Sequence, residues 1–248
     1  MRALSHEIFD DLEAEEDQLE QILSGLNDDD WSRRSGASGW TIADVVLHLA
    51  QTEEAVVAAT TGDSPLPDWG QYGDSVDEVM DTLVRTERGA PEEALRRWRA
   101  ARRAALAGLR QADPQRPVPW VVSPLKPQTL ATTRLAEHWA HALDVTGPLG
   151  IHYPDTARLR HVAWLSHHML PYAFALAGQP AHEVYCELVA PDGDVWRLGS
   201  PQAGSAITGP AGTFCRVAAQ RLAPEDSGLV TTGPHGDAAL RVLRTYAG

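Results

Sequence analysis

Apolar residues recur at helical spacing through most of this chain, and the pattern changes to alternation near its end. Between residues 5 and 26 they fall three or four positions apart, which predicts an amphipathic helix. Thr41 and Asp44 have the spacing of a capping box, which predicts a second helix that starts there and carries His48 on its apolar face. Further helices are predicted from Pro91 to about residue 109 and over residues 75–88, 128–146 and 155–177, the last kinked by Pro171.

From about residue 180 the pattern is typical of strands. Residues 183–189 and 194–198 alternate on either side of a Pro-Asp-Gly-Asp turn, which predicts an antiparallel hairpin. Further strands are predicted at 206–208 and 228–232, and helices at 212–222 and 235–246. We therefore expect an α+β protein with a helical domain over residues 1–179 and a smaller αβ domain over residues 180–248.

Composition narrows the possible partners. With 248 residues, 43% of them hydrophobic, the chain can bury a full core. Its formal charge of −13 argues against nucleic acid and anionic lipid as partners. Cys186 and Cys215 form no CxxC pair, and the chain shows neither a secretory signal nor a membrane-spanning stretch. A cytoplasmic protein, monomeric or homodimeric, is expected, with a small molecule as its substrate.

The best candidate chemistry is a metal site. Glu137 and His141 are four residues apart and share one helix face, and His48 lies on a separate apolar helix. Three nitrogen and oxygen ligands would leave a coordination position open, as in catalytic sites. The alternatives are a Glu–His hydrogen bond on a solvated face, a core role for His48, or the three side chains simply hydrogen-bonded together.

Neighbouring residues suggest supporting roles. His138 lies about 100° round the helix from Glu137, so it cannot easily join the same ligand set, but it could line a cavity or act as a base. Asp144 is placed to accept the free ring N–H of His141. Arg221 could bring a cation to an anionic substrate, or could be a solvated helix residue. The side chains expected to line the cavity are Trp40, Trp120 and Trp139.

Two segments, SGWTIADVVLHLA (38–50) and RLAEHWAHALDV (134–145), together with the αβ tail, carry a family resemblance. The chain resembles the mycothiol-dependent maleylpyruvate isomerase family of the DinB-like superfamily. It is most similar to an actinobacterial branch known only as metal-binding, which shares the stretch at 117–120. The resemblance implies a four-helix bundle with a smaller sterol-carrier-like domain. It also implies that His48, Glu137 and His141 hold a divalent ion, usually zinc, with Arg221 the nearest match to a functional arginine.

These observations predict a divalent-metal-dependent enzyme that acts on a small molecule. The expected reaction is thiol-assisted isomerisation or S-transfer, with a thiol such as mycothiol as cosubstrate. A hydrolase or cyclase that uses metal-bound water, with His138 as its base, is an alternative. A non-catalytic protein that binds a metal or a small molecule is another. Zinc suits two imidazoles and a carboxylate, and iron(II), nickel and manganese also accept them.

Overall fold

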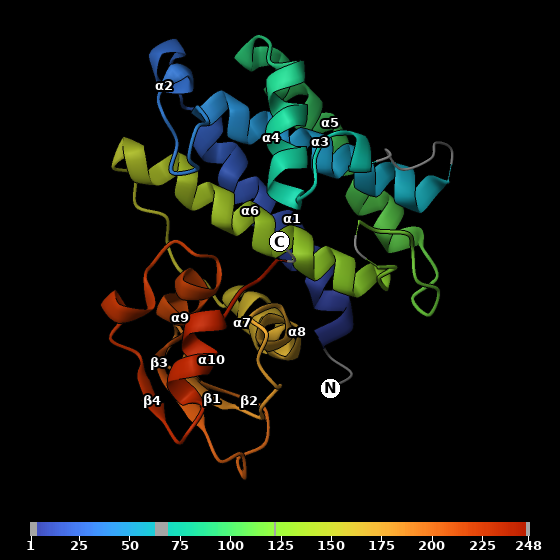
Figure 1. The fold of residues 1–248 in the computed structure, drawn as a ribbon. Helices are drawn as coiled ribbons and strands as arrows, with labels where there is room; N and C mark the ends of the chain where they lie inside the picture. Colours follow the sequence, from blue (N-terminus) through green and yellow to red (C-terminus); the bar gives the residue numbers. More distant parts are fainter. Residues whose placement is uncertain (1–3, 63–68, 122, 247–248) are drawn as a thin grey trace. The chain divides into compact units, whose positions relative to one another are not determined.

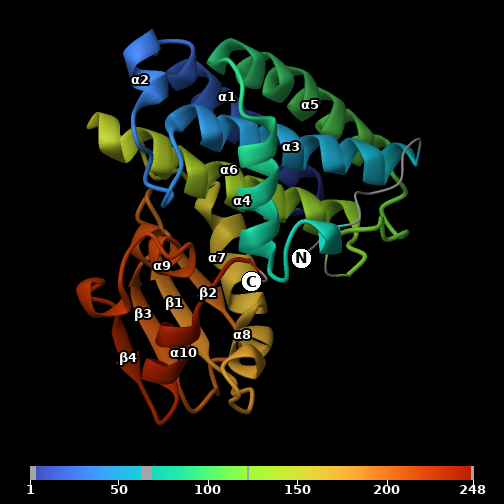
Figure 2. The same ribbon diagram turned by 45° about the horizontal axis from the view of Figure 1, so that its top comes forward.

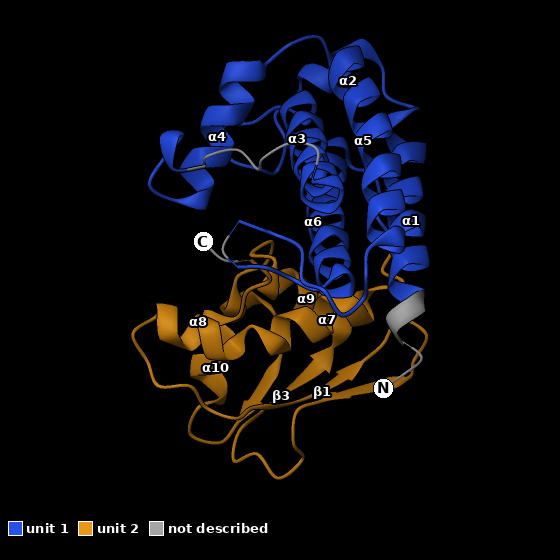
Figure 3. Cartoon of the chain, turned by 90° about the vertical axis from the view of Figure 1, so that its right-hand side faces the viewer, with its two compact units in different colours: residues 1–153, 247–248 blue, residues 154–246 orange. Residues whose placement is uncertain are grey.

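The computed structural model describes residues 4–62, 69–121 and 123–246 (Figure 1). It divides into two compact units, residues 1–153 and residues 154–246 (Figure 3). The regular secondary structure of the first unit is helical in the described residues, whereas the second unit combines helices with a four-stranded sheet. The predicted α+β class is confirmed.

The first unit is built on four long helices. Its elements are α1 (Leu4–Leu23), α2 (Asp28–Ser32), α3 (Ile42–Thr61), a short 3-10 helix (Trp69–Gln71), α4 (Val76–Glu87), α5 (Pro91–Gln111) and α6 (Pro127–Leu149). Helices α1, α3, α5 and α6 form the bundle, in which α3 packs against α5 and α6, and α1 packs against α6 and α5 (Figures 1 and 2). Its fully buried core includes Leu12, Leu19, Leu49, Trp98, Leu109, Leu130 and Trp139. The short helix α2 lies between the first two predicted helices and begins at a capping box formed by Asn27 and Asp30.

The predicted capping box at the start of α3 is present. The Asp44 backbone N–H donates to Thr41 Oγ1 at 3.2 Å, and the Thr41 N–H donates to Asp44 Oδ2 at 2.8 Å. Asp44 also accepts a bidentate pair of hydrogen bonds from Arg88, at 2.8 and 2.9 Å. The first turn of α3 is therefore fixed both locally and to the segment that follows α4, and His48 comes one turn later.

Helix α6 continues past its predicted end at residue 146 and includes Pro148. A proline inside a helix removes the N–H that would bond to the carbonyl four residues earlier, here that of Asp144. The backbone N–H of Gly36 donates to this carbonyl instead, at 2.8 Å. A donor from a distant loop thus satisfies the carbonyl that Pro148 leaves free, and the helix ends at Gly150 with φ 67°.

The second unit is a small helix-and-sheet layer. Its elements are α7 (Leu159–His168), α8 (Leu170–Leu176), β1 (Tyr185–Val189), β2 (Val195–Leu198), β3 (Ala206–Pro210), α9 (Ala211–Ala218), a 3-10 helix (Pro224–Asp226), β4 (Val230–Thr232) and α10 (Gly236–Val242). The strand order is β2-β1-β3-β4, with β1 parallel to β3 and both outer pairs antiparallel. The predicted hairpin of β1 and β2 is confirmed.

The segment before this sheet differs from the expectation. The helix predicted over residues 155–177 is two helices, α7 and α8, that meet at Met169, with Pro171 in the first turn of α8. Helix α7 packs against α9 and β2, so the second unit begins at Pro154 and not at residue 180. The change from a helical to an alternating pattern marks where the strands begin. It does not show that the two helices before the strands belong to the same unit.

No helix among the described residues is both long enough and apolar enough to cross a membrane.

Candidate metal centre

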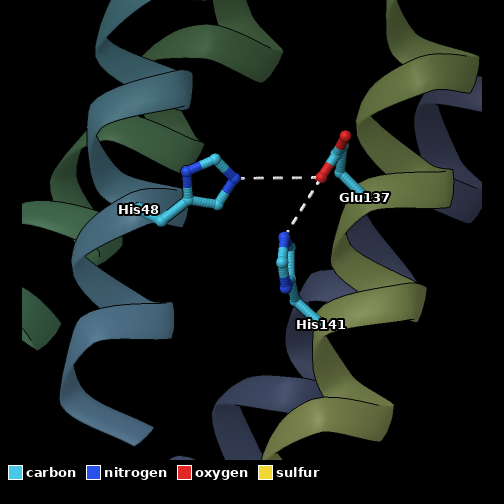
Figure 4. A group of neighbouring side chains, drawn as sticks. All are labelled: His48, Glu137 and His141. Atoms are coloured by element: carbon cyan, nitrogen blue, oxygen red, sulfur yellow. Dashed lines mark ion pairs between the residues drawn. The ribbon is translucent and has the colours of Figure 1, made fainter. Parts of the chain in front are cut away.

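Two neighbouring helices of the bundle bring three predicted ligands together. His48 lies on α3, while Glu137 and His141 lie on successive turns of α6, which packs against α3 (Figure 4). One ligand atom from each residue lies within 4.8 Å of the others. The spacing of four residues on α6 and the apolar face of α3 thus place the three side chains as the sequence predicted.

The side chains face a common point without bonding tightly to one another. Glu137 Oε2 lies 3.9 Å from His48 Nε2 and 3.3 Å from His141 Nε2. The first distance is too long for a hydrogen bond. The two imidazole rings have their centroids 4.9 Å apart and meet edge to face. Such an arrangement, with two nitrogens and one oxygen directed inward, suits a cation between them.

Asp144 fixes the orientation and tautomer of His141. Its Oδ2 lies 2.9 Å from His141 Nδ1, and both side chains are buried. Because an ionised carboxylate only accepts hydrogen bonds, Nδ1 carries a proton and Nε2 is directed at Glu137. The predicted partnership between these two residues is present in the structure.

The electrostatics favour the ligand form of His48 and Glu137, and they favour the protonated ring of His141. Burial lowers the pKa of His48 to about 4, so this ring is neutral. Burial opposes the charged form of Glu137, but His141, His48 and Arg134 together bring its pKa well below the usual value. For His141 burial favours the neutral ring, whereas hydrogen bonding to Asp144 and Glu137 raises its pKa. The site thus combines a carboxylate with a neutral imidazole and a more basic one.

The indole ring of Trp40 lies beside both imidazoles. The ring of Trp40 lies 5.0 Å from that of His48 and 6.3 Å from that of His141, centroid to centroid. Its indole N–H donates to Asp81 on α4 at 3.1 Å, which sets the plane of the ring. Of the other tryptophans expected to line the site, Trp139 is buried on α6 and Trp120 is half-buried in the connector before it.

His138 belongs to a second buried group, with Glu16 and Glu53, that also has ligand-like spacing. Its Nδ1 lies 2.9 Å from the carbonyl of Arg134, which only accepts, and its Nε2 accepts from the Trp98 indole at 3.0 Å. Both ring nitrogens are therefore engaged, and burial together with the charge of Arg134 lowers the His138 pKa to about 3. These contacts support a structural role, and the predicted role of His138 as a base has no support in them.

Arg221 lies in the second unit, three residues after the end of α9. Its Nη1 donates to the carbonyl of Ala219 at 2.7 Å, and the side chain is half-buried. Its action on an anionic substrate stays a prediction.

Sequence reasoning missed the ion pair that lies beside the ligands. Arg134 Nε donates to Glu53 Oε1 at 2.7 Å, and both side chains are buried. The available signal was a charge at helical spacing on a buried face: Arg134 lies three residues before Glu137, and Glu53 lies four residues after Leu49. A buried charge needs a partner, so each of these residues predicted that one existed.

Comparison with known proteins agrees with the fold. Two Mycobacterium tuberculosis proteins, the uncharacterized protein MT0041 of strain CDC 1551 / Oshkosh and the uncharacterized protein Rv0036c of strain ATCC 25618 / H37Rv, are each 32% identical over 242 residues. The alignments cover 96% of this chain and 94% of theirs. Crystal structures of the mycothiol-dependent maleylpyruvate isomerase and of a mutant of it match with a TM-score of 0.63 at 15% identity.

Those two structural matches cover 92% of this chain and 92% of the solved chains, so they extend over both units. The family model of the mycothiol maleylpyruvate isomerase N-terminal domain matches residues 12–146. That range includes all three candidate ligands, the whole of α3 and α5, and parts of α1 and α6. The chain therefore belongs to the mycothiol maleylpyruvate isomerase family.

Proposed function

We propose that this chain is a divalent-metal-dependent enzyme that acts on a small molecule with the help of a low-molecular-weight thiol. The observation that carries the proposal is the convergence of His48 Nε2, His141 Nε2 and Glu137 Oε2 on one point. The mycothiol-dependent maleylpyruvate isomerase, which shares the fold, supports the thiol and the isomerisation. Family membership supports the same class of reaction.

The residues fit a catalytic metal better than a structural one. Two imidazoles and one carboxylate suit zinc, and three protein ligands leave a position for a guest. Zinc is therefore the first metal to test. Iron(II), nickel and manganese accept the same donors and are tested next. The alternative of three side chains that merely bond to one another is disfavoured by the distance of 3.9 Å between His48 and Glu137.

The thiol has to come from outside the chain. Burial raises the pKa of Cys186 to about 12, and burial also raises the pKa of Cys215, which lies fully buried in the second unit. Neither sulfur is exposed as a thiolate at neutral pH, and the thiolate is the nucleophilic form. A small thiol as cosubstrate removes this difficulty.

A bound divalent cation would lower the pKa of such a thiol or polarise a substrate carbonyl. For a cis-unsaturated keto acid, the thiolate sulfur bonds to an alkene carbon and the electron pair of the double bond moves toward the carbonyl. Rotation about the resulting single bond and cleavage of the carbon–sulfur bond then give the trans isomer and return the thiolate, with no net oxidation. With another electrophile the carbon–sulfur bond is kept, and the outcome is S-transfer.

The test is an isomerisation assay on zinc-loaded protein with maleylpyruvate as substrate, in the presence and absence of mycothiol. We expect conversion of the cis to the trans isomer only when protein and mycothiol are both present. His141→Ala should abolish conversion, whereas His168→Ala is the matched control, because His168 stacks on Trp164 and not on a ligand. Conversion that does not need the thiol would favour activated water and a hydrolase or cyclase. Binding of both small molecules with no turnover would favour a non-catalytic binding protein.

A further inference from the structure

A buried polar link lies one helical turn from the candidate metal centre. Thr52 on α3 comes four residues after His48, and Arg134 on α6 comes three residues before Glu137. Both side chains are buried, with relative exposures of 7% for Thr52 and 3% for Arg134. The link therefore joins the same two helices that carry the candidate ligands.

The link is a continuous series of hydrogen bonds from α6 to the α3 backbone at His48 and Leu49. Arg134 Nη2 donates to Thr52 Oγ1 at 2.7 Å. Thr52 Oγ1 lies 3.0 Å from the carbonyl oxygen of His48 and 3.1 Å from that of Leu49. Since a hydroxyl has one proton and can also accept, it donates to one of these carbonyls and accepts from the guanidinium.

The second hydrogen bond of the guanidinium keeps it in place. Arg134 Nε donates to Glu53 Oε1, so its planar group is held at two points on α3. Packing of apolar side chains tolerates small shifts of one helix along another, whereas a buried hydrogen bond does not, because an unpaired donor or acceptor costs about 1–3 kcal/mol. The two contacts thus fix the position of α3 along the axis of α6.

This axial position determines whether the three candidate ligands converge. His48 must face Glu137 and His141 across the helix interface, and a displacement of about 1 Å is enough to impair a site of this kind. We propose that Arg134, acting through the Thr52 hydroxyl, is a positioning residue of the metal centre that holds the backbone of His48 opposite Glu137 and His141. The inference rests on the proposed function, because it requires that the three ligands bind a metal.

The informative substitution is Thr52→Val, which replaces the hydroxyl by a methyl group of similar shape. It breaks the link to His48 and leaves the ion pair of Arg134 with Glu53 in place. Thr52→Ser keeps the hydroxyl and serves as the conservative rescue. Thr60→Val is the matched control, because Thr60 lies on the same helix and bonds through Oγ1 to the backbone carbonyls one turn earlier, with Val56 O at 2.8 Å.

The readouts are zinc affinity, measured by competition with a chelator, and the visible absorption spectrum of the cobalt(II)-loaded protein. Urea unfolding of the metal-free variants measures stability separately. We expect Thr52→Val to weaken zinc binding by about 10- to 100-fold and to alter the cobalt spectrum, as changes to the partners of metal ligands do. Thr52→Ser and Thr60→Val should both retain the affinity and spectrum of wild type.

A Thr52→Val protein that loses stability but keeps wild-type affinity and spectrum would overturn the inference and leave the proposed function intact. A wild-type protein that binds neither zinc nor cobalt would overturn the proposed function, and the inference with it. If Thr52→Val does not fold, Thr52→Ala, which also lacks the hydroxyl and relieves packing, is subject to the same two outcomes.

Discussion

His141 and Asp144 are joined by a buried hydrogen bond of 2.9 Å between Nδ1 and Oδ2, which directs the other ring nitrogen at Glu137. Replacement of Asp144 by asparagine keeps the size of the side chain and removes its charge. We expect Asp144→Asn to lower zinc affinity by about 10-fold or more, because the ring loses the anion that makes it a better donor. Chelator competition measures this, with Asp77→Asn, an exposed aspartate on α4, as the control. Equal affinities for the two variants would contradict the assigned role.

Substitution of Gly36 should weaken zinc binding, because Gly36 lies against Asp144. A Cβ atom at this position would lie 2.8 Å from Asp144 Oδ1 and 3.0 Å from Asp144 Cα. Gly36→Ala should therefore displace Asp144, destabilise the protein by about 1–3 kcal/mol and weaken zinc binding. Gly25→Ala is the control, because the nearest atom to its Cβ would be 3.5 Å away. Urea unfolding and zinc titration of both variants check the prediction, which fails if they behave alike.

Trp40 should report occupancy of the site. Its ring lies 5.0 Å from that of His48, so a paramagnetic ion held by the ligands would quench its fluorescence. We expect cobalt(II) to quench part of the emission of wild type, since the chain has eight tryptophans, and to quench much less in Trp40→Phe. Trp31→Phe, which removes a buried tryptophan on α2, should keep the full effect. Undiminished quenching in Trp40→Phe would show that cobalt binds elsewhere.

Glu16 should make stability depend on pH. Burial, together with the negative charge of Glu53, raises the pKa of Glu16 well above its ordinary value of 4.5, although Arg102 and Arg134 oppose the shift. The unfolded chain releases this proton near the ordinary value and the folded protein keeps it to higher pH. Between the pKa of Glu16 in the unfolded chain and its higher pKa in the folded protein, the folded state binds more protons. The free energy of unfolding therefore falls in this range by about 1.4 kcal/mol for each pH unit. Below this range the neutral acid contributes fully to stability.

Glu16→Gln should remove the contribution of Glu16 to this decline and gain stability relative to wild type as pH rises above the ordinary pKa of 4.5. Urea unfolding at several pH values measures the difference, with Glu92→Gln, an exposed residue on α5, as the control. Parallel curves for wild type and Glu16→Gln would show that Glu16 is not held neutral in the fold.

Much of the fold could be predicted because its signals are local. The capping box of Thr41 and Asp44, the proline at the start of α5 and the alternation in β1 and β2 each act within a few residues. The candidate ligands on α6 were found for the same reason, since four residues on a helix define one face. The structure brings His48 to that face, and the role of the three residues as ligands stays a prediction.

The remainder depends on contacts between distant segments. Helix α6 continues through Pro148, and the N–H of Gly36 bonds to the carbonyl of Asp144 that this proline leaves free. No local sequence pattern indicates that contact. The pairing of Arg134 with Glu53 joins residues 81 positions apart. The residue type of His138 and its place beside Glu137 suggest a catalytic group. Only its two hydrogen bonds, to Arg134 and Trp98, show that both ring nitrogens are engaged.

The most direct test of the metal centre is elemental analysis of protein purified without an affinity tag, for wild type and His48→Ala. We expect a near-stoichiometric divalent metal in wild type, or its uptake when zinc is supplied, and its loss in His48→Ala. Circular dichroism of the same samples checks that both are folded. Wild-type protein that is folded and takes up no metal, or a His48→Ala protein that retains it, would contradict the convergence of His48, Glu137 and His141 on one ion.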